Sequence, residues 1–399
     1  LHPTEGYVLL PPLPGIGDAP ALYHYAPRVH GLERRATLTR AVWTRQAPAD
    51  PSTSFLVGLT SIHWREAWKY GERAFRYCQH DVGHAIGSVR IAAQTLGWRM
   101  LLLDGLADDT VAALLGVDRA EDFEGAEREH PDCIAVLWPD DQAASRATGT
   151  TSGLPLSLAA DAVCHVTTHL WRGRANRLSR DEPVRWKILD QAVVASWKSN
   201  TEHNVVGLSQ AWSGADPSHR TPGPYSRHTS AAQVIRQRRS ALAFDGTTSI
   251  SAGSFFTMLM RVMPRVERGL SGRPMPWDAL PWEPAVHLAL FVHRVDGLEP
   301  GLYLLARDPA KLDLLRGATH PHFDWTSPES CPDELPLFLL QEGDARALSA
   351  QLSCGQDIAG ESAFSLGMIA EFEPSLRQHG AWFYRRLFWE AGLIGQVLY

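Results

Sequence analysis

Short apolar runs bounded by proline and glycine predict the strands in the first 140 residues of the chain. They cover residues 7–10, 22–25, 55–60 and 134–137, and a Pro/Gly-rich turn over residues 11–17 joins the first two into a hairpin-like pair. A long helical pattern at residues 64–96 ends before Gly97, a residue typical of the position after a helix C-terminus. A shorter helix is predicted over residues 108–115, stopped at Gly116.

Residues 140–226 separate this half from a second one and resemble neither. They contain two predicted helices, at residues 156–171 and 186–197, and a Pro/Gly/Ser-rich stretch over residues 213–224 that is typical of a linker. We interpret them as a connector packed on the outside of both halves.

The second half, residues 227–399, opens with a helix that reaches Arg239. Ser230, with Gln233 three residues later, forms a capping-box pattern at the head of this helix. Apolar runs predict strands over residues 286–292, 301–305 and 335–340, and residues 382–399 have helix composition.

The two halves share a spaced set of residues. Five residues of the first half align without a gap on residues 309 positions later: Phe55, Gly58, Gly71, Arg76 and Gly83 on Phe364, Gly367, Gly380, Arg385 and Gly392. Residues 3–8 also match 281–286, and residues 21–23 match 301–303, in the same order along the chain. We therefore predict two copies of one fold, residues 1–139 and 227–399.

The copies differ where chemistry would be done. Lys69-Tyr70 in the first half aligns with Gln378-His379 in the second, so a cation and a phenol are kept in one half only. A nearby ammonium favours the phenolate form of a tyrosine, which makes a usable base. Adjacent helix residues point about 100° apart, so we expect the two side chains to converge on a substrate and not on each other. The alternative is a solvated lysine beside an interfacial tyrosine.

His80 and His84 lie four residues apart beside Asp81, the spacing with which a helix presents two zinc ligands. The repeat argues against this interpretation, because the aligned residues are Trp389 and Leu393, which are bulky packing groups. We therefore expect no metal site here.

Arg238, Arg239 and Ser240 close the helix that starts at Ser230. Two guanidinium groups and a hydroxyl at a helix end can hold a phosphate through charge-assisted hydrogen bonds. Basic residues at a helix C-terminus can also merely complement the helix dipole. The pattern alone leaves both interpretations open.

The composition excludes several functional classes. A chain of 399 residues with 44% hydrophobic residues can form two sizeable cores. Its formal charge of -6, without a basic run flanked by aromatic residues, argues against a nucleic-acid partner. Five scattered cysteines predict a reducing compartment, by default the cytoplasm, and no apolar run has the roughly 18 to 20 residues of a membrane helix. Because the first residue is Leu1 and the last helical segment has no stop signal, we expect part of each copy to lie outside this sequence.

These residues together resemble the nitroreductase superfamily, and within it the SagB-type dehydrogenases, which include the thiazole and oxazole oxidases of peptide natural-product pathways. Residues 1–5 resemble the end of that group's Ser-Gly-Gly-x-x-His-Pro-x-Glu segment. Residues 68–77 with Gly83-His84 are similar to its most distinctive stretch, and Arg238-Arg239-Ser240 is similar to the superfamily's flavin phosphate motif. The resemblance covers both halves but not the connector.

The resemblance implies an α+β, nitroreductase-like fold that builds FMN sites at the interface of two copies, here a pseudo-dimer within one chain. It assigns cofactor-binding roles to Arg238, Arg239 and Ser240 in one copy, and to the region of His2, Pro3 and Glu5 in the other. The sequence departs from the family pattern at Leu242, where a second arginine is usual, and at residues 97–100, where a glycine pair is expected. We therefore expect one working flavin site.

Three functions remain open. In the first, an FMN-dependent oxidoreductase uses Lys69 or Tyr70 to remove an acidic proton from a small-molecule or peptide substrate such as an azoline, while hydride passes to the flavin. In the second, the same fold serves a nicotinamide-dependent nitro- or quinone reductase. In the third, a flavin-less pseudo-dimer acts as a binding partner in a biosynthetic complex.

Overall fold

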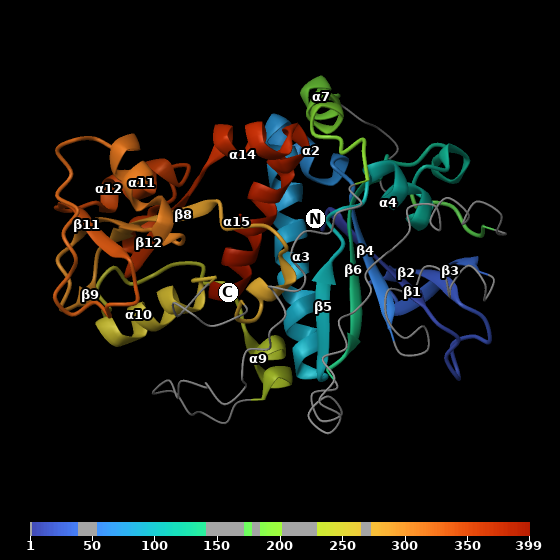
Figure 1. Ribbon diagram of the computed structural model, residues 1–399, viewed down its shortest axis with the longest axis horizontal. Helices are drawn as coiled ribbons and strands as arrows, with labels where there is room; N and C mark the ends of the chain where they lie inside the picture. The colour runs from blue at the N-terminus through green and yellow to red at the C-terminus, as the bar shows by residue number, and fades with distance from the viewer. Residues whose placement is uncertain (1, 39–53, 141–170, 178–183, 202–229, 265–272) are drawn as a thin grey trace. The chain divides into compact units, whose positions relative to one another are not determined.

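The computed structural model describes residues 2–38, 54–140, 171–177, 184–201, 230–264 and 273–399, which fall into two compact units (Figure 1). The first unit contains Leu1–Ser213, Met275–Trp282 and Glu373–Gln396, and the second contains Gly214–Pro274, Glu283–Phe372 and Val397–Tyr399. The units therefore follow other boundaries than the predicted halves, because Glu373–Gln396 joins the first unit.

A six-stranded antiparallel sheet forms the centre of the first unit. Its strands lie in the order β3 (Gly31–Thr37), β2 (Ala21–Ala26), β1 (Thr4–Leu10), β4 (Phe55–Ser61), β6 (His130–Pro139) and β5 (Trp98–Leu102). Alternate residues of β1, including Tyr7 and Leu9, are buried, as expected for a strand with one face on a core. Helix α4 (Asp108–Leu115) adds Leu114 and Leu115 to this core and ends at Gly116, whose φ of 71° is left-handed.

Most helices of the first unit come after β4 in the chain, and further ones come from the C-terminal segment that belongs to this unit. Their bounds are α2 (Trp64–Tyr70), η1 (Gly71–Arg73), α3 (Ala74–Thr95), η2 (Ala120–Phe123), α7 (Lys187–Ala195), η4 (Trp277–Ala279), α14 (Phe372–His379), η6 (Ala381–Phe383) and α15 (Tyr384–Leu398). The predicted single helix over residues 64–96 is interrupted at Gly71. Its φ of 58° and ψ of -131° form a conformation open to glycine and strained for other residues.

A four-stranded antiparallel sheet forms the centre of the second unit, in the order β11 (Leu337–Glu342), β10 (Gly301–Leu305), β8 (Val286–Val292) and β12 (Phe364–Ala370). A short parallel pair, β7 (Ile250–Ser251) and β9 (Val295–Asp296), accompanies it. The helices are α9 (Ala231–Gln237), α10 (Ala252–Arg261), η5 (Pro309–Lys311), α11 (Leu312–Ala318), α12 (Arg346–Leu352) and α13 (Asp357–Glu361). The predicted cap of α9 is confirmed, because the Ser230 side chain accepts a hydrogen bond from the Gln233 amide.

The second sheet repeats the order of four strands of the first. Strands β11, β10, β8 and β12 stand in the places of β3, β2, β1 and β4. Both sheets also carry a β-bulge at the same point, between Leu22 and Tyr23 in β2 and between Leu302 and Tyr303 in β10. The predicted match of residues 21–23 with 301–303 agrees with this register.

The strand register corrects one of the predicted matches. Gly58 of β4 pairs with Tyr7, and the aligned Gly367 of β12 pairs with Ala289. Thr4 at the start of β1 therefore corresponds to Val286 at the start of β8. The predicted match of residues 3–8 with 281–286 is therefore four positions away from the alignment that the strand pairing gives. It rested on similar residues that precede the second strand.

Helices α3 and α15 lie side by side in the first unit and touch at two glycines (Figure 1). A Cβ atom on Gly83 would lie 2.8 Å from the Cα of Gly392, and one on Gly392 would lie 2.9 Å from the Cα of Gly83. Both distances are shorter than any that real Cβ atoms show, so the two backbones approach this closely only because both residues are glycine.

Side chains near these glycines also contact each other across the two helices, in a reciprocal pattern. The indole of Trp389 donates a hydrogen bond of 2.7 Å to Gln79 Oε1, and the edge of the His80 ring faces Phe388 at 5.1 Å between centroids. Residues 388 and 389 are the positions 309 after residues 79 and 80. Each helix therefore offers the same positions to the other, as in a contact about a twofold axis.

Part of the predicted connector belongs to the core of the first unit. Leu189 of α7 packs against Ala67, Ala74 and Phe75, and Lys198 is only 2% exposed. The interpretation of residues 140–226 as a layer outside both halves is therefore wrong for this segment. The predicted helix over residues 186–197 is α7, whereas the one over residues 156–171 lies outside the described residues except for Trp171.

Two strands of the first sheet were not predicted from the sequence. Strand β3 reads Gly-Leu-Glu-Arg-Arg-Ala-Thr, and β5 starts directly after Gly97. Both lie at the edges of the sheet, where polar residues are common because one side of the strand is open.

Across the described ranges, no helix is long and apolar enough to cross a membrane. Within the same ranges Cys78, Cys133 and Cys331 form no disulfide, and the two thiols of the first unit, Cys78 and Cys133, are buried. Burial raises the pKa of Cys78 and Cys133 well above the ordinary thiol value, so both are packing groups.

Candidate functional site

Lys69 and Tyr70 form the last turn of α2, directly before the first elbow, a name used here for η1 (Gly71–Arg73). Lys69 is exposed and Tyr70 is half-buried. The Lys69 ammonium lies 5.1 Å from the centroid of the Tyr70 ring, which lies 4.5 Å from the Tyr77 ring. The two side chains of the pair therefore meet over the ring face, contrary to the expectation that they point apart, because cation–π attraction rewards this contact.

Gln378 and His379 lie at the same point of α14, before the second elbow, which is Gly380 with η6 (Ala381–Phe383). The His379 ring stacks on Phe383 with 4.4 Å between centroids and 21° between planes, and it faces the Trp382 ring at 6.3 Å. The second helix end thus presents a stacked imidazole where the first presents an ammonium and a phenol. The predicted difference between the copies falls at equivalent helix ends.

Arg238 and Ser240 contact Tyr399 in the second unit, and Arg239 lies between them in the chain. The Arg238 guanidinium lies over the Tyr399 ring at 3.4 Å, and the Ser240 hydroxyl lies 3.0 Å from the Tyr399 hydroxyl. Arg239 Nη1 donates to the carbonyls of Arg236 and Arg238, at the end of α9. Arg239 therefore also satisfies carbonyls at the helix C-terminus, as in the dipole interpretation.

His2, Pro3 and Glu5 lie at the start of β1 in the first unit. Glu5 Oε2 lies 2.6 Å from His24 Nε2, its other oxygen pairs with Arg65, and Arg65 Nη1 donates to the His2 carbonyl at 2.8 Å. Burial raises the pKa of Glu5, but the hydrogen bonds and charges of His24 and Arg65 outweigh burial and lower it. Both carboxylate oxygens are therefore engaged within the unit.

The candidate residues thus form two groups. The Lys69-Tyr70 pair and the His2–Glu5 segment belong to the first unit, and Arg238, Arg239 and Ser240 belong to the second. Tyr399, which sequence reasoning did not single out, joins the second group. Its only sequence signal was an aromatic residue in a helix-like segment.

His80 and His84 lie along the contact between α3 and α15. His80 faces Phe388, and His84 Nδ1 lies 3.2 Å from Gln396 Oε1. Burial lowers the pKa of His80 to about 4, with the His84 and Arg76 charges adding to the effect. No group of three or more metal-ligating side chains occurs in the described part of the chain.

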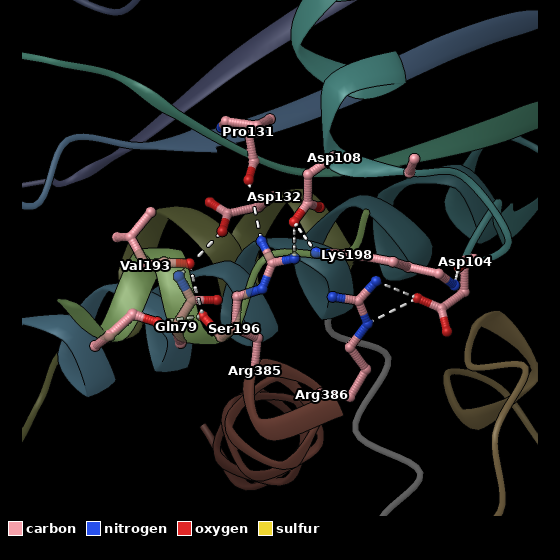
Figure 2. A network of polar contacts seen from close by, with 12 residues as sticks. Gln79, Asp104, Asp108, Pro131, Asp132, Val193, Ser196, Lys198, Arg385 and Arg386 are labelled. Carbon is pink, nitrogen blue, oxygen red and sulfur yellow. Dashed lines mark hydrogen bonds and ion pairs between the residues drawn. The ribbon is translucent and has the colours of Figure 1, made fainter. Parts of the chain in front are cut away.

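A buried ionic network lies where α15 meets α4 and β6, and sequence reasoning missed it (Figure 2). Arg385 pairs with Asp108 through Nη2 and donates to the Pro131 carbonyl at 3.2 Å, and Arg386 reaches Asp104 Oδ1 at 2.7 Å. Both arginines are less than 5% exposed. A buried arginine without its carboxylate would be strongly destabilising, so these pairs hold α15 in place.

Lys198 completes this network from the connector (Figure 2). Its backbone amide donates to Asp108 Oδ2 at 2.7 Å, and its ammonium donates to the Asp104 carbonyl at 2.6 Å. The same ammonium lies 3.9 Å from the Trp382 ring centroid, at the second elbow. The connector is therefore tied to the second elbow by a buried cation.

Asp132 marks a second polar cluster in the same core. It accepts hydrogen bonds from Ser61 at 2.6 Å and from Gln79 at 3.0 Å. Burial raises the pKa of Asp132 to about 6, against the lowering effect of Arg385. Nearby, His63 and His130 stack at 4.7 Å, and burial lowers the pKa of both rings, that of His130 to about 4.

Comparison with known proteins identifies the fold. No family model matches the chain, and no curated protein matches it. A solved structure of a putative nitroreductase from Anabaena variabilis matches over 100% of this chain and 72% of its own, with a TM-score of 0.63 and 18% sequence identity. The E. coli microcin synthetase McbBCD complex with truncated pro-MccB17 bound matches over 34% of this chain and 52% of its own, at 19% identity, with a TM-score of 0.28 that is too low for a shared fold.

The chain therefore has a mixed α/β fold that is similar to a nitroreductase structure over its whole length. The flavin that the sequence resemblance implies would need a site for its phosphate. The chemistry of Arg238, Ser240 and Tyr399 fits a phosphate, since a guanidinium group and two hydroxyls lie together beside the end of α9, and Arg239 adds a second guanidinium at the same helix end. Leu242, at the position of the usual second arginine, is 96% exposed and adds no donor.

Proposed function

We propose that the chain is a pseudo-dimer of two nitroreductase-like copies, arranged as an α+β tandem form. The proposal is supported by the repeated strand order, the shared β-bulge and the reciprocal contact of α3 with α15. Without duplication, the strand order, the position of the bulge and the helix contact would each have to arise independently, whereas duplication explains them together.

We further propose an FMN-dependent oxidoreductase of the SagB-type dehydrogenase group. The observation that carries this proposal is the likeness to a nitroreductase structure along the whole chain. The substrate class proposed is an azoline, small or peptide-borne, in a biosynthetic complex in the cytoplasm. When bound, FMN supplies a two-electron acceptor for such a substrate.

The residues proposed to hold FMN are Arg238, Arg239 and Ser240, at its phosphate. We also propose flavin-binding roles for His2, Pro3 and Glu5 of the first copy. Because this donor set occurs once in the described chain, we propose one FMN per chain.

The proton-handling group is proposed to be the Lys69-Tyr70 pair. Removal of an acidic C–H proton needs a base within hydrogen-bond reach of it. Among the described residues, neither the Tyr70 hydroxyl nor the Lys69 ammonium has a hydrogen-bond partner, so both are open to a substrate. The Lys69 ammonium lies 5.1 Å from the centroid of the Tyr70 ring, so a substrate that reaches one group also reaches the other.

A non-catalytic binding partner is the second candidate, favoured by two observations. Arg239 already donates to its own helix, and Leu242 replaces a donor with an exposed apolar side chain. The visible spectrum of the purified protein separates this candidate from a flavoenzyme. Bleaching by an azoline supports the oxidase, bleaching by reduced nicotinamide supports a nitro- or quinone reductase, and a colourless protein after reconstitution with FMN contradicts both.

The proposed base is tested by comparing the two helix ends. Tyr70→Phe and Lys69→Ala should each slow substrate-driven flavin reduction by about 10², the scale of a general base, without changing flavin content. Gln378→Ala and His379→Ala are the matched controls and should change the rate less than threefold. Equal losses from both pairs would assign a site to each half, and no loss from the Lys69-Tyr70 changes would remove the base from the proposal.

A further inference from the structure

An indole ring covers the first elbow. If Gly71 carried a Cβ atom, this atom would lie 3.0 Å from Cζ2, 3.2 Å from Cη2 and 3.3 Å from Cε2 of Trp186. The six-membered part of the indole therefore rests on the Gly71 backbone. Glycine is favoured here for two reasons: its φ of 58° strains other residues, and a Cβ atom would press on this ring and require it to move by a few tenths of an ångström.

Trp186 is held in this position by the helix that follows it. It is the residue before α7, and Leu189, one turn on, packs between Ala67 of α2 and Ala74 and Phe75 of α3. The apolar contacts of α7 thus fall on both sides of the elbow, on α2 before it and on α3 after it. Because α7 bridges the two helices, the indole is fixed relative to both of them.

The second elbow has an indole of its own. Gly380, with a φ of 100°, would place a Cβ atom 3.2 Å from Cδ1 of Trp382, two residues later. The Lys198 ammonium covers the Trp382 ring. The connector segment from Trp186 to Lys198 therefore contacts both elbows, with an aromatic ring at one and a cation at the other.

The position of Trp186 bears directly on the Lys69-Tyr70 pair. These are the last two residues of α2, and Gly71 follows Tyr70, so the direction of both side chains depends on where the helix ends. Tyr70 is also held from the far side by the Tyr77 ring of α3. A change in the elbow angle moves Tyr70 relative to Tyr77, because the two rings stand on opposite sides of it.

We propose that Trp186 is a positioning residue for the Lys69-Tyr70 pair, through its contact with the Gly71 backbone. The inference rests on the proposed function for the chemistry, but its structural part stands alone. Misplacement of a reacting group by about 1 Å lowers a rate by up to about 10², so loss of the indole should slow proton removal without weakening flavin binding.

The structural part is tested on protein without flavin. A 3-fluorotyrosine at position 70 reports the environment of this ring by ¹⁹F resonance. Trp186→Ala should shift and broaden the resonance, Trp186→Phe should restore most of it, and the matched Trp382→Ala should leave it unchanged. An unchanged resonance in Trp186→Ala overturns the proposal, whether or not the protein binds FMN.

The kinetic part uses the flavin-loaded protein. Trp186→Ala should lower the maximal rate of substrate-driven flavin reduction by tenfold or more, with KM and the FMN dissociation constant within twofold, and Trp186→Phe should recover at least half of the loss. A shifted resonance with an unchanged maximal rate would make Trp186 a packing residue only and overturn the proposal. A parent protein that binds no FMN counts against the proposed function, and the ¹⁹F result then decides the position of Tyr70 by itself.

Discussion

Replacing Gly83 or Gly392 by alanine should destabilise the first unit severely. Each new Cβ atom would fall within 3 Å of the opposing Cα, and within reach of the backbone carbonyl of Trp389 or His80. These are backbone atoms and cannot rotate away, so the helices must separate along their whole contact. Separation also stretches the hydrogen bond between Trp389 and Gln79.

The magnitude follows from two opposing effects. Alanine gains about 1 kcal/mol over glycine in a helix interior. Overpacking costs about 1 to 3 kcal/mol where side chains can adjust, and more where backbone must move. Because backbone must move at this contact, we take a cost of about 3 to 5 kcal/mol, which leaves a net loss of about 2 to 4 kcal/mol in the free energy of unfolding, or on the order of 5 to 15 °C in Tm for a unit of this size.

Two other glycines give graded controls. A Cβ atom on Gly87 would meet only side-chain atoms, Leu393 Cδ1 at 2.6 Å and Gln396 Cγ at 2.9 Å, so Gly87→Ala should cost about 1 kcal/mol. Gly253 of α10 has nothing within 4 Å, so Gly253→Ala should be neutral or stabilising by up to about 1 kcal/mol.

Urea unfolding followed by circular dichroism measures these differences, and hydrogen exchange in peptides of α3 assigns them to the first unit. The double change of Gly83 and Gly392 to alanine should cost less than the sum of the single changes, because the first separation makes room for the second Cβ. If both single variants unfold at the same urea concentration as Gly87→Ala, the close helix contact does not carry the stability claimed for it.

Three further predictions concern charge and ligands. The pKa values of His63 and His130 in the folded state lie below the unfolded value of about 6.5. Below pH 6.5 the unfolded chain therefore takes up protons that the folded chain does not, and each ring lowers the free energy of unfolding by about 1.4 kcal/mol per pH unit. The pKa of Asp132, raised to about 6, has the opposite effect, because the folded chain takes up a proton there between pH 6 and 4 and is stabilised by it. Asp132→Asn should therefore make the urea midpoint of unfolding fall more steeply from pH 7 to 5 than in the parent protein, and the same fall in both proteins would contradict this account. Arg239→Ala should raise the FMN dissociation constant about tenfold with the fold intact, from loss of one charged contact of about 1.5 kcal/mol, and unchanged flavin release on dilution would leave Arg239 as a helix cap. His80→Ala should leave the zinc content unchanged in elemental analysis, and loss of stoichiometric zinc would restore the metal interpretation.

Local signals predicted much of the fold because they act over a few residues. The bounds of α4, β8 and β10 match the predicted ranges, since each combines an apolar run with an adjacent turn residue. Strand β4 was predicted over residues 55–60, whereas β12 was not predicted, although Phe364 aligns with Phe55 in the repeat. The elbow was missed because Gly71 looks like a tolerated glycine within one continuous helical pattern.

The site was harder to predict because its contacts are long-range. Arg385 and Asp108 are 277 residues apart, and nothing near either residue marks its partner. Nothing in the sequence near Lys198 or Trp186 marks their partners either. Lys198 looks like an ordinary charged residue of a connector, and no local pattern indicates that Trp186 lies over Gly71. The Lys69-Tyr70 contact was mispredicted because helical spacing fixes the Cβ directions, whereas two long side chains can still bend toward each other.

The contact between α3 and α15 can form only late in synthesis. Gly83 and Gly392 are 309 residues apart, and a ribosome adds about 5 to 20 residues per second, so α3 waits on the order of 15 to 60 seconds for its partner. During this interval the sheet of the first unit can pair its strands, but the face of α3 around Gly83 stays uncovered. The segment made first is thus completed late, and a translational pause before residue 373 would prolong its exposure to chaperones and proteases.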